Sequence, residues 1–215
     1  MANEKHYVPY GLRDIWFGEY SYSDGAISYA NQQVLGRGIT ATFDLKFAEG
    51  RLYSSGALSR YKKKLTGGSI SLNVEDLPQS IQKSIFAATE YSRNVGTGSS
   101  TAVKSIGYNR NSGGRYVGIA TYVPADEASG DGYIGVFVHK AMFGPPSMSY
   151  QTENDSIQWT TPTTTGEFVD PDGTQSDGSP WSQIEIAEFA TEAEALAWCL
   201  SLIHISEPTR PRLIS

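Results

Sequence analysis

Residues 69–74 read SISLNV, and this short stretch decides the fold class. Ile70, Leu72 and Val74 occupy alternate positions, and Ser71 and Asn73 separate them. Because successive side chains of a β-strand point to opposite faces, this alternation is typical of a strand with one buried face. It predicts a mainly β protein.

Four further stretches have strand character. The first is 39–47, ITATFDLKF, in which the odd-numbered apolar residues are predicted to face inward: Ile39, Ala41, Phe43, Leu45 and Phe47. Residues 115–123 and 132–143 flank the turn-rich segment PADEASGDG and are predicted to form a long hairpin. Residues 156–161, SIQWTT, would place Ile157 and Trp159 on one face. Short strands separated by Gly, Asn, Asp and Pro predict a single-domain β-sandwich or barrel.

Two segments predict helices that flank the sheet. In residues 75–91 the apolar residues Leu77, Ile81, Ile85 and Ala88 recur at spacings of three and four. Pro78 lies where the first turn of a helix tolerates its missing N–H. In residues 189–198 Thr191 is an N-cap candidate, and Glu194 has the spacing of a capping box with Phe189 or Ala190 as the preceding apolar contact. The second helix is expected to be short.

Composition excludes several classes of protein. The chain has 215 residues, a net charge of −6 and one cysteine. An acidic chain lacks the basic footprint of a nucleic-acid-binding protein, and a single cysteine cannot form an intramolecular disulfide. The N-terminus has no secretory signal and no run is long enough to span a membrane, so neither export nor membrane association is expected. The Lys62–Lys64 triplet is interpreted as a solvated strand end or loop.

The titratable residues do not form a recognisable site. His6, His139 and His204 are far apart in sequence, and His139 is expected on the less apolar face of its strand. Ser80 and Lys83 match an S-x-x-K spacing without its companion motifs, so a solvated helix face is expected.

The acidic segment 170–178, DPDGTQSDG, fails the spacing of a calcium loop. Asp170, Asp172 and Asp177 are therefore interpreted as turn formers in a loop that spans residues 166–181. No catalytic, cofactor-binding or metal-binding residue is predicted, and the chain is not expected to be an enzyme.

Aromatic residues make up 12% of the chain. They suit half-buried strands and subunit interfaces, but a row of exposed rings could also stack on sugars. Trp16, Tyr20 and Tyr22 would be the best material for a monomeric carbohydrate-binding module, which is the alternative function. A hydrolase is a weaker alternative.

The order of five motifs carries a family resemblance. They are YGLRDIWFGEY (10–20), GGSISLNVEDLPQSIQKSIF (67–86), GRYVGIATYV (114–123), YIGVFVHKAMFGPPSMSYQTENDSIQWTTPTTTGEF (133–168) and PWSQIEIAEFATEAEALAW (180–198). In this order they resemble the major tail protein family of long-tailed bacteriophages, the phi13-type major tail proteins. The resemblance covers almost the whole chain up to residue 199.

The resemblance implies a structural virion protein. Six copies would form a ring, and rings would stack into the tail tube through which double-stranded DNA passes without tight binding. The partners would be other copies of the chain, the tape measure protein and the tail terminator, with assembly in the host bacterial cytoplasm. Expected contact segments are residues 6–15, 93–101 and 166–181. The family has no catalytic residues to transfer.

The C-terminal peptide LSLIHISEPTR (200–210) resembles the translation of a sequencing adapter used with transposon-based libraries. On this basis residues 1–199 are expected to be the tail tube domain. Residues 200–215 are expected to be non-native and to contribute nothing to the fold.

Overall fold

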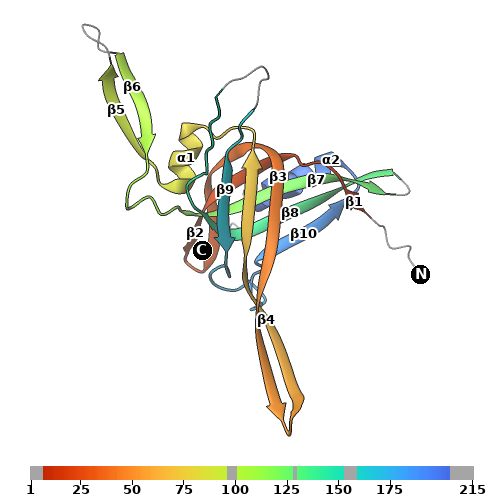
Figure 1. Cartoon of the computed structure of the whole chain (residues 1–215). Helices are drawn as coiled ribbons and strands as arrows, with labels where there is room; N and C mark the ends of the chain where they lie inside the picture. Colours follow the sequence, from red (N-terminus) through yellow and green to blue (C-terminus); the bar gives the residue numbers. More distant parts are fainter. Residues whose placement is uncertain (1–6, 96–100, 128–129, 153–158, 204–215) are drawn as a thin grey trace, which may run out of the picture.

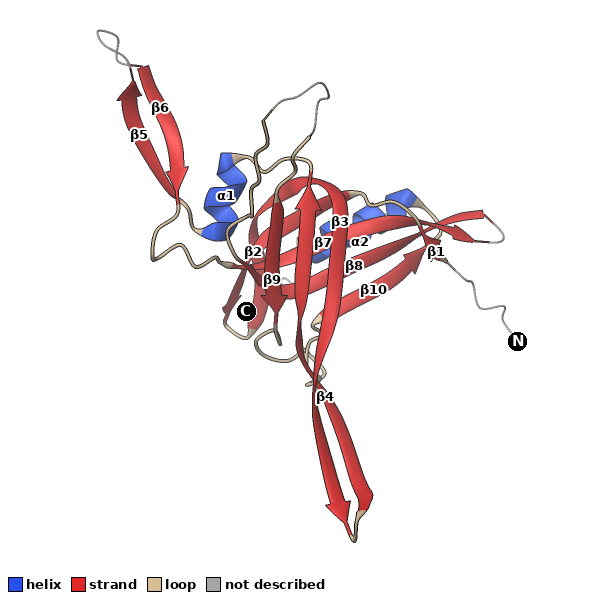
Figure 2. Cartoon of the chain, viewed as in Figure 1, coloured by secondary structure: helices blue, strands red, loops and turns tan. Residues whose placement is uncertain are grey.

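The computed structural model describes residues 7–95, 101–127, 130–152 and 159–203, and it is built mainly from antiparallel strands (Figures 1 and 2). The elements are β1 (Val8–Pro9), β2 (Asp14–Ser23), β3 (Ala26–Ser54), β4 (Ala57–Val74), α1 (Gln79–Phe86), β5 (Thr89–Val95), β6 (Thr101–Gly107), β7 (Tyr116–Glu127), β8 (Gly130–Phe143), β9 (Thr163–Phe168), β10 (Ile184–Phe189) and α2 (Glu192–Ile203). The predicted mainly β fold with two helices is confirmed.

The large sheet closes into a barrel. Its strand order is β1-β7-β2-β3-β4-β9-β8-β10, and an additional β7–β8 pairing joins the two ends of the path β7-β2-β3-β4-β9-β8. The β7–β8 pairing also confirms the predicted hairpin. Closure removes the open edges that a flat sheet would leave, except at the flanking strands β1 and β10.

Two tight turns organise the first half of the barrel. Asp24–Gly25 joins β2 to β3, and Ser55–Gly56 joins β3 to β4. All four residues have positive φ, between 51° and 82°. This is the backbone of two-residue type I′ turns, whose twist matches that of the strands they connect.

The barrel interior contains the first hydrophobic cluster. Ile70, Leu72 and Val74 are fully buried there, as their alternation predicted. Helix α1 adds Ile81 and Ile85 to the same cluster, so its apolar stripe packs as expected. Further members are Ile15, Phe17, Leu35, Phe86, Val117, Ile119, Val138, Ala141, Phe143 and Phe168.

Helix α2 covers the outer face of β7 and β8 and forms a second cluster with them. The predicted capping box is present: the Glu194 N–H donates to Thr191 Oγ1 at 3.3 Å, and the Thr191 N–H donates to Glu194 Oε2 at 3.1 Å. The buried members of the cluster are Ile27, Tyr29, Ala120, Tyr122, Phe137, Ala195, Cys199 and Ile203.

The expected boundary after residue 199 lies inside α2, which continues to Ile203. Ile203 is fully buried, and its carbonyl accepts a hydrogen bond from Gln32 Nε2 at 3.2 Å. The expectation that residues 200–215 contribute nothing is therefore wrong for 200–203, because this turn completes the apolar face of the helix. Residues 204–215 lie outside the described part of the chain.

Several strand expectations need correction. Of the residues predicted to face inward in 39–47, only Ala41 and Phe43 pack against the interior cluster. Ile39 is exposed because it lies at an irregularity of the β3–β4 register, between Gly38 and Thr40. The remaining two, Leu45 and Phe47, are exposed because β3 leaves the barrel there.

Three boundaries differ in other parts of the chain. Ile157 lies outside the described residues, and Trp159 is exposed and lies outside any strand. Helix α1 ends before Ala88, because Ala87 has a left-handed backbone that terminates it, although Ala88 is buried. The loop expected at 166–181 begins only after Phe168, where β9 ends.

Candidate functional site

A β-bulge brings two buried polar side chains together on β8. Val117 pairs with Ala141 and Ile119 pairs with Val138, so His139 and Lys140 together lie opposite Gly118. The sequence shows no such feature, because the irregularity belongs to the pairing of two strands. It places two polar side chains where regular alternation would bury only one.

The imidazole of His139 is buried and fully hydrogen-bonded. Its Nε2 lies 2.9 Å from Glu185 Oε1, and its Nδ1 lies 3.1 Å from the Tyr29 hydroxyl. Burial lowers the pKa of His139, while Glu185 acts in the opposite direction. As expected, His139 lies outside the apolar interior that holds Val138, but it is only 1% exposed there and contacts Phe137 and Trp181.

The ammonium of Lys140 lies in a cage of two tyrosines and one carboxylate. Its Nζ is 2.6 Å from Asp172 Oδ2, and 4.7 Å and 5.2 Å from the ring centres of Tyr116 and Tyr20. Tyr20 also donates to Asp172 Oδ2 at 3.0 Å. The hydrogen bond from Lys140 lowers the pKa of Asp172.

This cage changes the interpretation of the acidic loop. Asp177 accepts hydrogen bonds from Ser179 and forms the predicted turn. Asp170 and Asp172 do more than form turns, because Asp170 accepts a hydrogen bond from Gln183 and Asp172 binds Lys140. The loop is thereby held against the outer face of the barrel.

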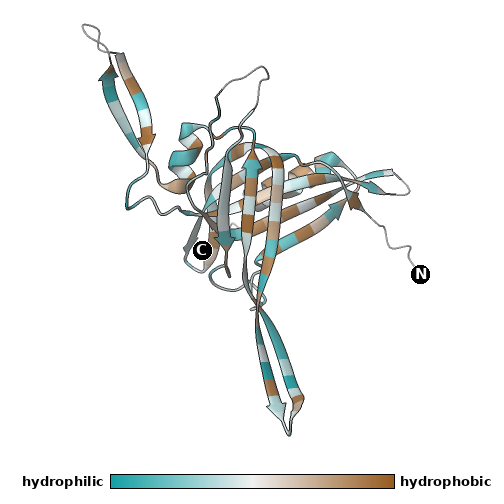
Figure 3. Ribbon diagram, in the orientation of Figure 1, coloured by the Kyte–Doolittle hydropathy of each residue, from teal (hydrophilic) through white to brown (hydrophobic). Residues whose placement is uncertain are grey.

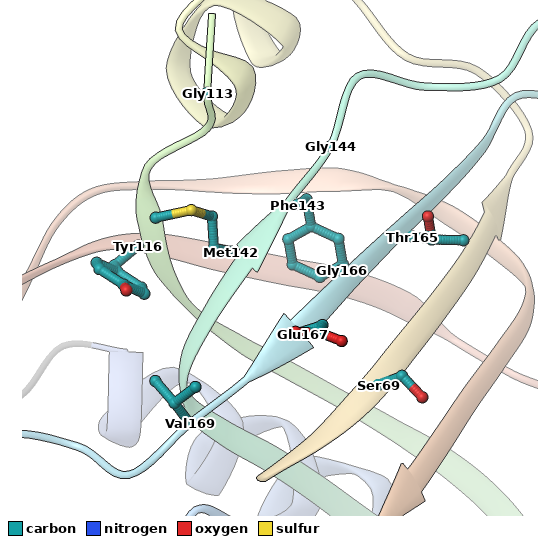
Figure 4. A pocket seen from close by; sticks show the side chains of 10 residues that line it. All are labelled: Ser69, Gly113, Tyr116, Met142, Phe143, Gly144, Thr165, Gly166, Glu167 and Val169. Carbon is teal, nitrogen blue, oxygen red and sulfur yellow. The ribbon is translucent and has the colours of Figure 1, made fainter.

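A surface hollow shares Tyr116 with this cage and is lined mostly by uncharged residues. The hollow lies over β8 and β9, with a volume of about 510 Å³, and Tyr116, Met142 and Val169 lie at its rim (Figure 4). Its one charged lining residue, Glu167, is paired with Lys46 at 2.5 Å. Within the described ranges, no three His, Cys, Asp or Glu side chains are close enough together to hold a metal ion.

The remaining motifs of the sequence have simple structural roles. Ser80 and Lys83 are exposed on α1, as expected, and Lys83 pairs with Glu90 at 3.2 Å. In the parts of the chain that the structure covers, no helix has the length and apolarity needed to cross a membrane.

The three aromatic residues considered for sugar binding do not form an exposed row. Trp16 stacks on Tyr122, with ring centres 5.8 Å apart, and packs against the second cluster. Tyr20 packs edge-on against Tyr29 in the same layer, and only Tyr22 is exposed. The rings of Trp16 and Tyr20 therefore pack against the second hydrophobic cluster of the barrel.

The most conspicuous unpartnered surface is a two-stranded arm, Phe47–Leu65, formed by the distal halves of β3 and β4 (Figures 1 and 2). Most of its side chains are exposed, and among the described residues no third strand pairs with it. Isolated two-stranded hairpins are marginally stable in water. An arm of this length therefore requires strong pairing of its own or a partner.

One face of the arm is internally paired. Glu49 lies 3.6 Å from Lys63 Nζ and 3.4 Å from Arg51 Nη2. Lys63 also lies 4.3 Å from the ring centre of Phe47, and Arg51 lies 5.7 Å from that of Tyr61. These contacts explain how the arm can hold its shape outside the barrel.

The other face, here called the basic face, carries Arg60, Lys62 and Lys64. The residues opposite them are Leu52, Gly50 and Ala48, which carry no charge. The Lys62–Lys64 triplet is exposed, as expected, but it divides between faces, because Lys63 lies on the internally paired one. Among the described residues, no carboxylate forms an ion pair with the basic face.

Other unpartnered surfaces are found on the remaining projections. Hairpin β5–β6 extends from the barrel as a separate sheet with hydrophilic and hydrophobic positions along its strands (Figure 3). Tyr91, Val95 and Val103 are exposed on it. Strand β10 pairs with β8 on one side, and no described strand covers its other edge. Ile186, at the centre of β10, is 67% exposed. Such edges are templates for pairing with another chain.

The expected contact segments coincide only in part with these surfaces. Of residues 6–15, Val8–Pro9 form β1 and Asp14 begins β2, while His6 lies outside the described residues. Of 93–101, the ends belong to β5 and β6, and 96–100 lie outside the described residues. The β3–β4 arm was missed, although the Ser55–Gly56 turn between two polar, alternating runs is a signal that could have located it.

Comparison of the chain with models of known protein families and with curated proteins gave no match.

Proposed function

We propose that this chain is a structural virion protein, a tail tube subunit of a long-tailed bacteriophage, that assembles with copies of itself into stacked hexameric rings. The single observation that carries the proposal is the β3–β4 arm, which extends from the barrel with its side chains exposed. A monomer gains nothing from a hairpin that packs against no core. A polymer gains a contact that reaches the neighbouring subunit.

The uncovered apolar side chains of the arm support this use. Leu52, Tyr53 and Leu58 near its tip are each more than half exposed. Leaving such side chains in water is unfavourable. Full burial of a large apolar side chain contributes about 1.5–3 kcal/mol, and about half of that remains to be gained at each of these partly covered residues. A surface of this kind on a projecting hairpin is typical of an interaction site rather than of a free monomer.

Strand β10 offers a second means of association. Pairing of its free edge with another subunit would extend the sheet and cover Ile186. Arm docking brings different patches of the two partners together, so this contact is heterologous. Contacts of this type generate rings when the rotation closes and filaments when it does not, which is the geometry a stacked tube needs.

The remaining features of the proposal follow from the family resemblance. The tape measure protein and the tail terminator would be further partners, and double-stranded DNA would pass through the tube without tight binding. The protein would act in the virion tail, would be assembled in the bacterial cytoplasm, and would not be an enzyme. No specific observation favours the carbohydrate-binding alternative, because Trp16 and Tyr20 are engaged in the barrel wall.

Shortening the arm tests the proposal. Replacing residues 49–63 by Asn-Gly would join Ala48 to Lys64, which already face each other across the hairpin, through a two-residue turn. We expect the shortened protein to keep its circular dichroism spectrum and melting temperature, since the removed residues are exposed. Electron microscopy and sedimentation velocity should show rings or tubes for the full chain and monomers for the shortened one.

Two outcomes would contradict the proposal. One is a full chain that remains a compact monomer at every concentration tested. The other is a shortened chain that assembles as readily as the full chain. Tryptophan fluorescence that changes with added sugars, in a protein that never assembles, would favour the carbohydrate-binding module instead.

A further inference from the structure

We infer that the basic face of the β3–β4 arm docks onto the tip of the β7–β8 hairpin of a second copy of this chain. The inference rests on the proposed function and specifies one of its contacts. Two surfaces of opposite charge carry it, and each lacks an ion-pair partner among the described residues.

The first surface is the row formed by Arg60, Lys62 and Lys64. These residues lie at alternate positions of one strand, so their side chains emerge on one face, about 7 Å apart along it. The residues across the hairpin are uncharged, and all three cations are exposed. Like charges in a row repel one another, and an acidic partner would relieve that repulsion.

The second surface is the tip of the β7–β8 hairpin. Asp126 and Asp131 are directly opposite each other in the strand register, and both are exposed. Like charges at directly opposed positions destabilise a strand pair. A cation placed between the two carboxylates would convert this repulsion into attraction, and the described ranges contain no such cation within ion-pair distance.

The two surfaces cannot satisfy each other within one molecule. The arm and the β7–β8 tip leave the barrel in different directions, with the arm at the bottom of the view and the tip at its right (Figure 1). They are complementary in charge, so a contact between them would join two molecules. Because different patches meet, it is a head-to-tail contact that can repeat from one subunit to the next.

Nucleic acid is the other acidic partner that a row of three cations could bind. The net charge of −6 opposes approach of the chain to a polyanion as a whole. A second copy, in contrast, provides a carboxylate pair that needs a cation. The observations therefore favour the second copy.

Charge exchange tests the contact in the full chain. The arm variant is Lys62→Glu with Lys64→Glu, and the tip variant is Asp126→Lys with Asp131→Lys. We expect each to raise the concentration needed for assembly by about tenfold or more, and a chain that carries both to assemble near the wild-type concentration. Lys83→Glu with Arg110→Glu makes the same charge change at two exposed positions outside the expected contact segments and should have a much smaller effect.

Two results of the charge exchange would overturn the inference. If the arm and tip variants assemble like the wild type, the charges are not used. If each variant is impaired and their combination is not restored, the two surfaces do not meet.

Disulfide cross-linking detects the contact independently of rings or tubes. Lys62→Cys and Asp131→Cys variants, mixed and oxidised, should form mixed dimers that neither variant forms with the wild type. The natural Cys199 does not interfere, because it is buried and burial raises its pKa to about 12. A mixture of Lys83→Cys and Asp131→Cys is the matched control, because Lys83 is exposed on α1 outside the expected contact segments. No excess of cross-linking over this control would contradict the inference.

The outcomes separate this contact from the proposed function. Wild-type rings without specific cross-linking would leave the tube proposal standing and overturn the arm–tip contact. Specific cross-linking without rings would leave the contact standing and count against the tube. Salt-sensitive binding of short duplex DNA that disappears in the arm variant, with no specific cross-link, would identify the basic face as a nucleic-acid contact and overturn the inference.

Discussion

Replacing Ile203 by alanine should destabilise the protein, although this residue lies in the last turn of α2. Ile203 is fully buried in the cluster between α2 and the barrel. Buried Ile→Ala changes cost about 2–5 kcal/mol, and the lower part of this range applies where a helix end can partly collapse into the space. A loss of about 2–3 kcal/mol in a chain of this size lowers the melting temperature by about 5–10 °C.

Thermal and urea unfolding, followed by circular dichroism, measure this effect. Ser201→Ala is the matched control, because Ser201 is exposed and its hydroxyl donates to the Trp198 carbonyl in the same helix. The control should stay within about 0.5 kcal/mol of the wild type. A chain that ends at Cys199 should lose at least as much stability as Ile203→Ala. Equal stability of the Ile203→Ala and Ser201→Ala variants would refute the packing role assigned to this turn.

Two further predictions concern the β8 bulge. Gly118→Ala should lower the free energy of unfolding by about 1–3 kcal/mol in urea titrations, because the added Cβ would lie 2.5 Å from the ring of Tyr29. Gly113→Ala is the control and should change the free energy of unfolding little, because there is open space around Gly113. Lys140 lowers the pKa of Asp172, so this carboxylate stabilises the fold above its unfolded pKa of about 4, and that contribution is lost as pH falls through the lower folded value. Asp172→Asn should flatten the acid limb of the stability profile between about pH 4 and pH 2, and an unchanged limb would show that the cage does not act through this charge.

Local patterns in the sequence determined the class of fold. The alternation of Ile70, Leu72 and Val74 depends only on the two-residue period of a strand, and it gave the buried face correctly. The capping box of Thr191 and Glu194 is equally local, because both hydrogen bonds close within one helical turn. Features of this kind can be read from a sequence without knowledge of any long-range contact.

Position relative to the barrel was decided by the tertiary structure. Leu45 and Phe47 continue the alternation of a buried strand, but their strand leaves the barrel at this point and the same side chains become exposed. The sequence also predicted that α2 would end near residue 199. The cluster on the outer face of β7 and β8 continues to Ile203, and this cluster, rather than helix propensity, sets the extent of the packed helix.

The candidate interaction surfaces depend on strand register, which single-strand patterns do not contain. Lys62 and Lys64 share a face because their strand is regular there, and Lys63 lies on the opposite face with Glu49. His139 and Lys140 lie on one side of β8 only because the β7–β8 pairing has a bulge opposite Gly118. Composition and alternation thus determined that the chain folds as a β protein. The register between distant strands decided which charges are paired internally and which face solvent, because a shift of one residue moves a side chain to the opposite face of the sheet.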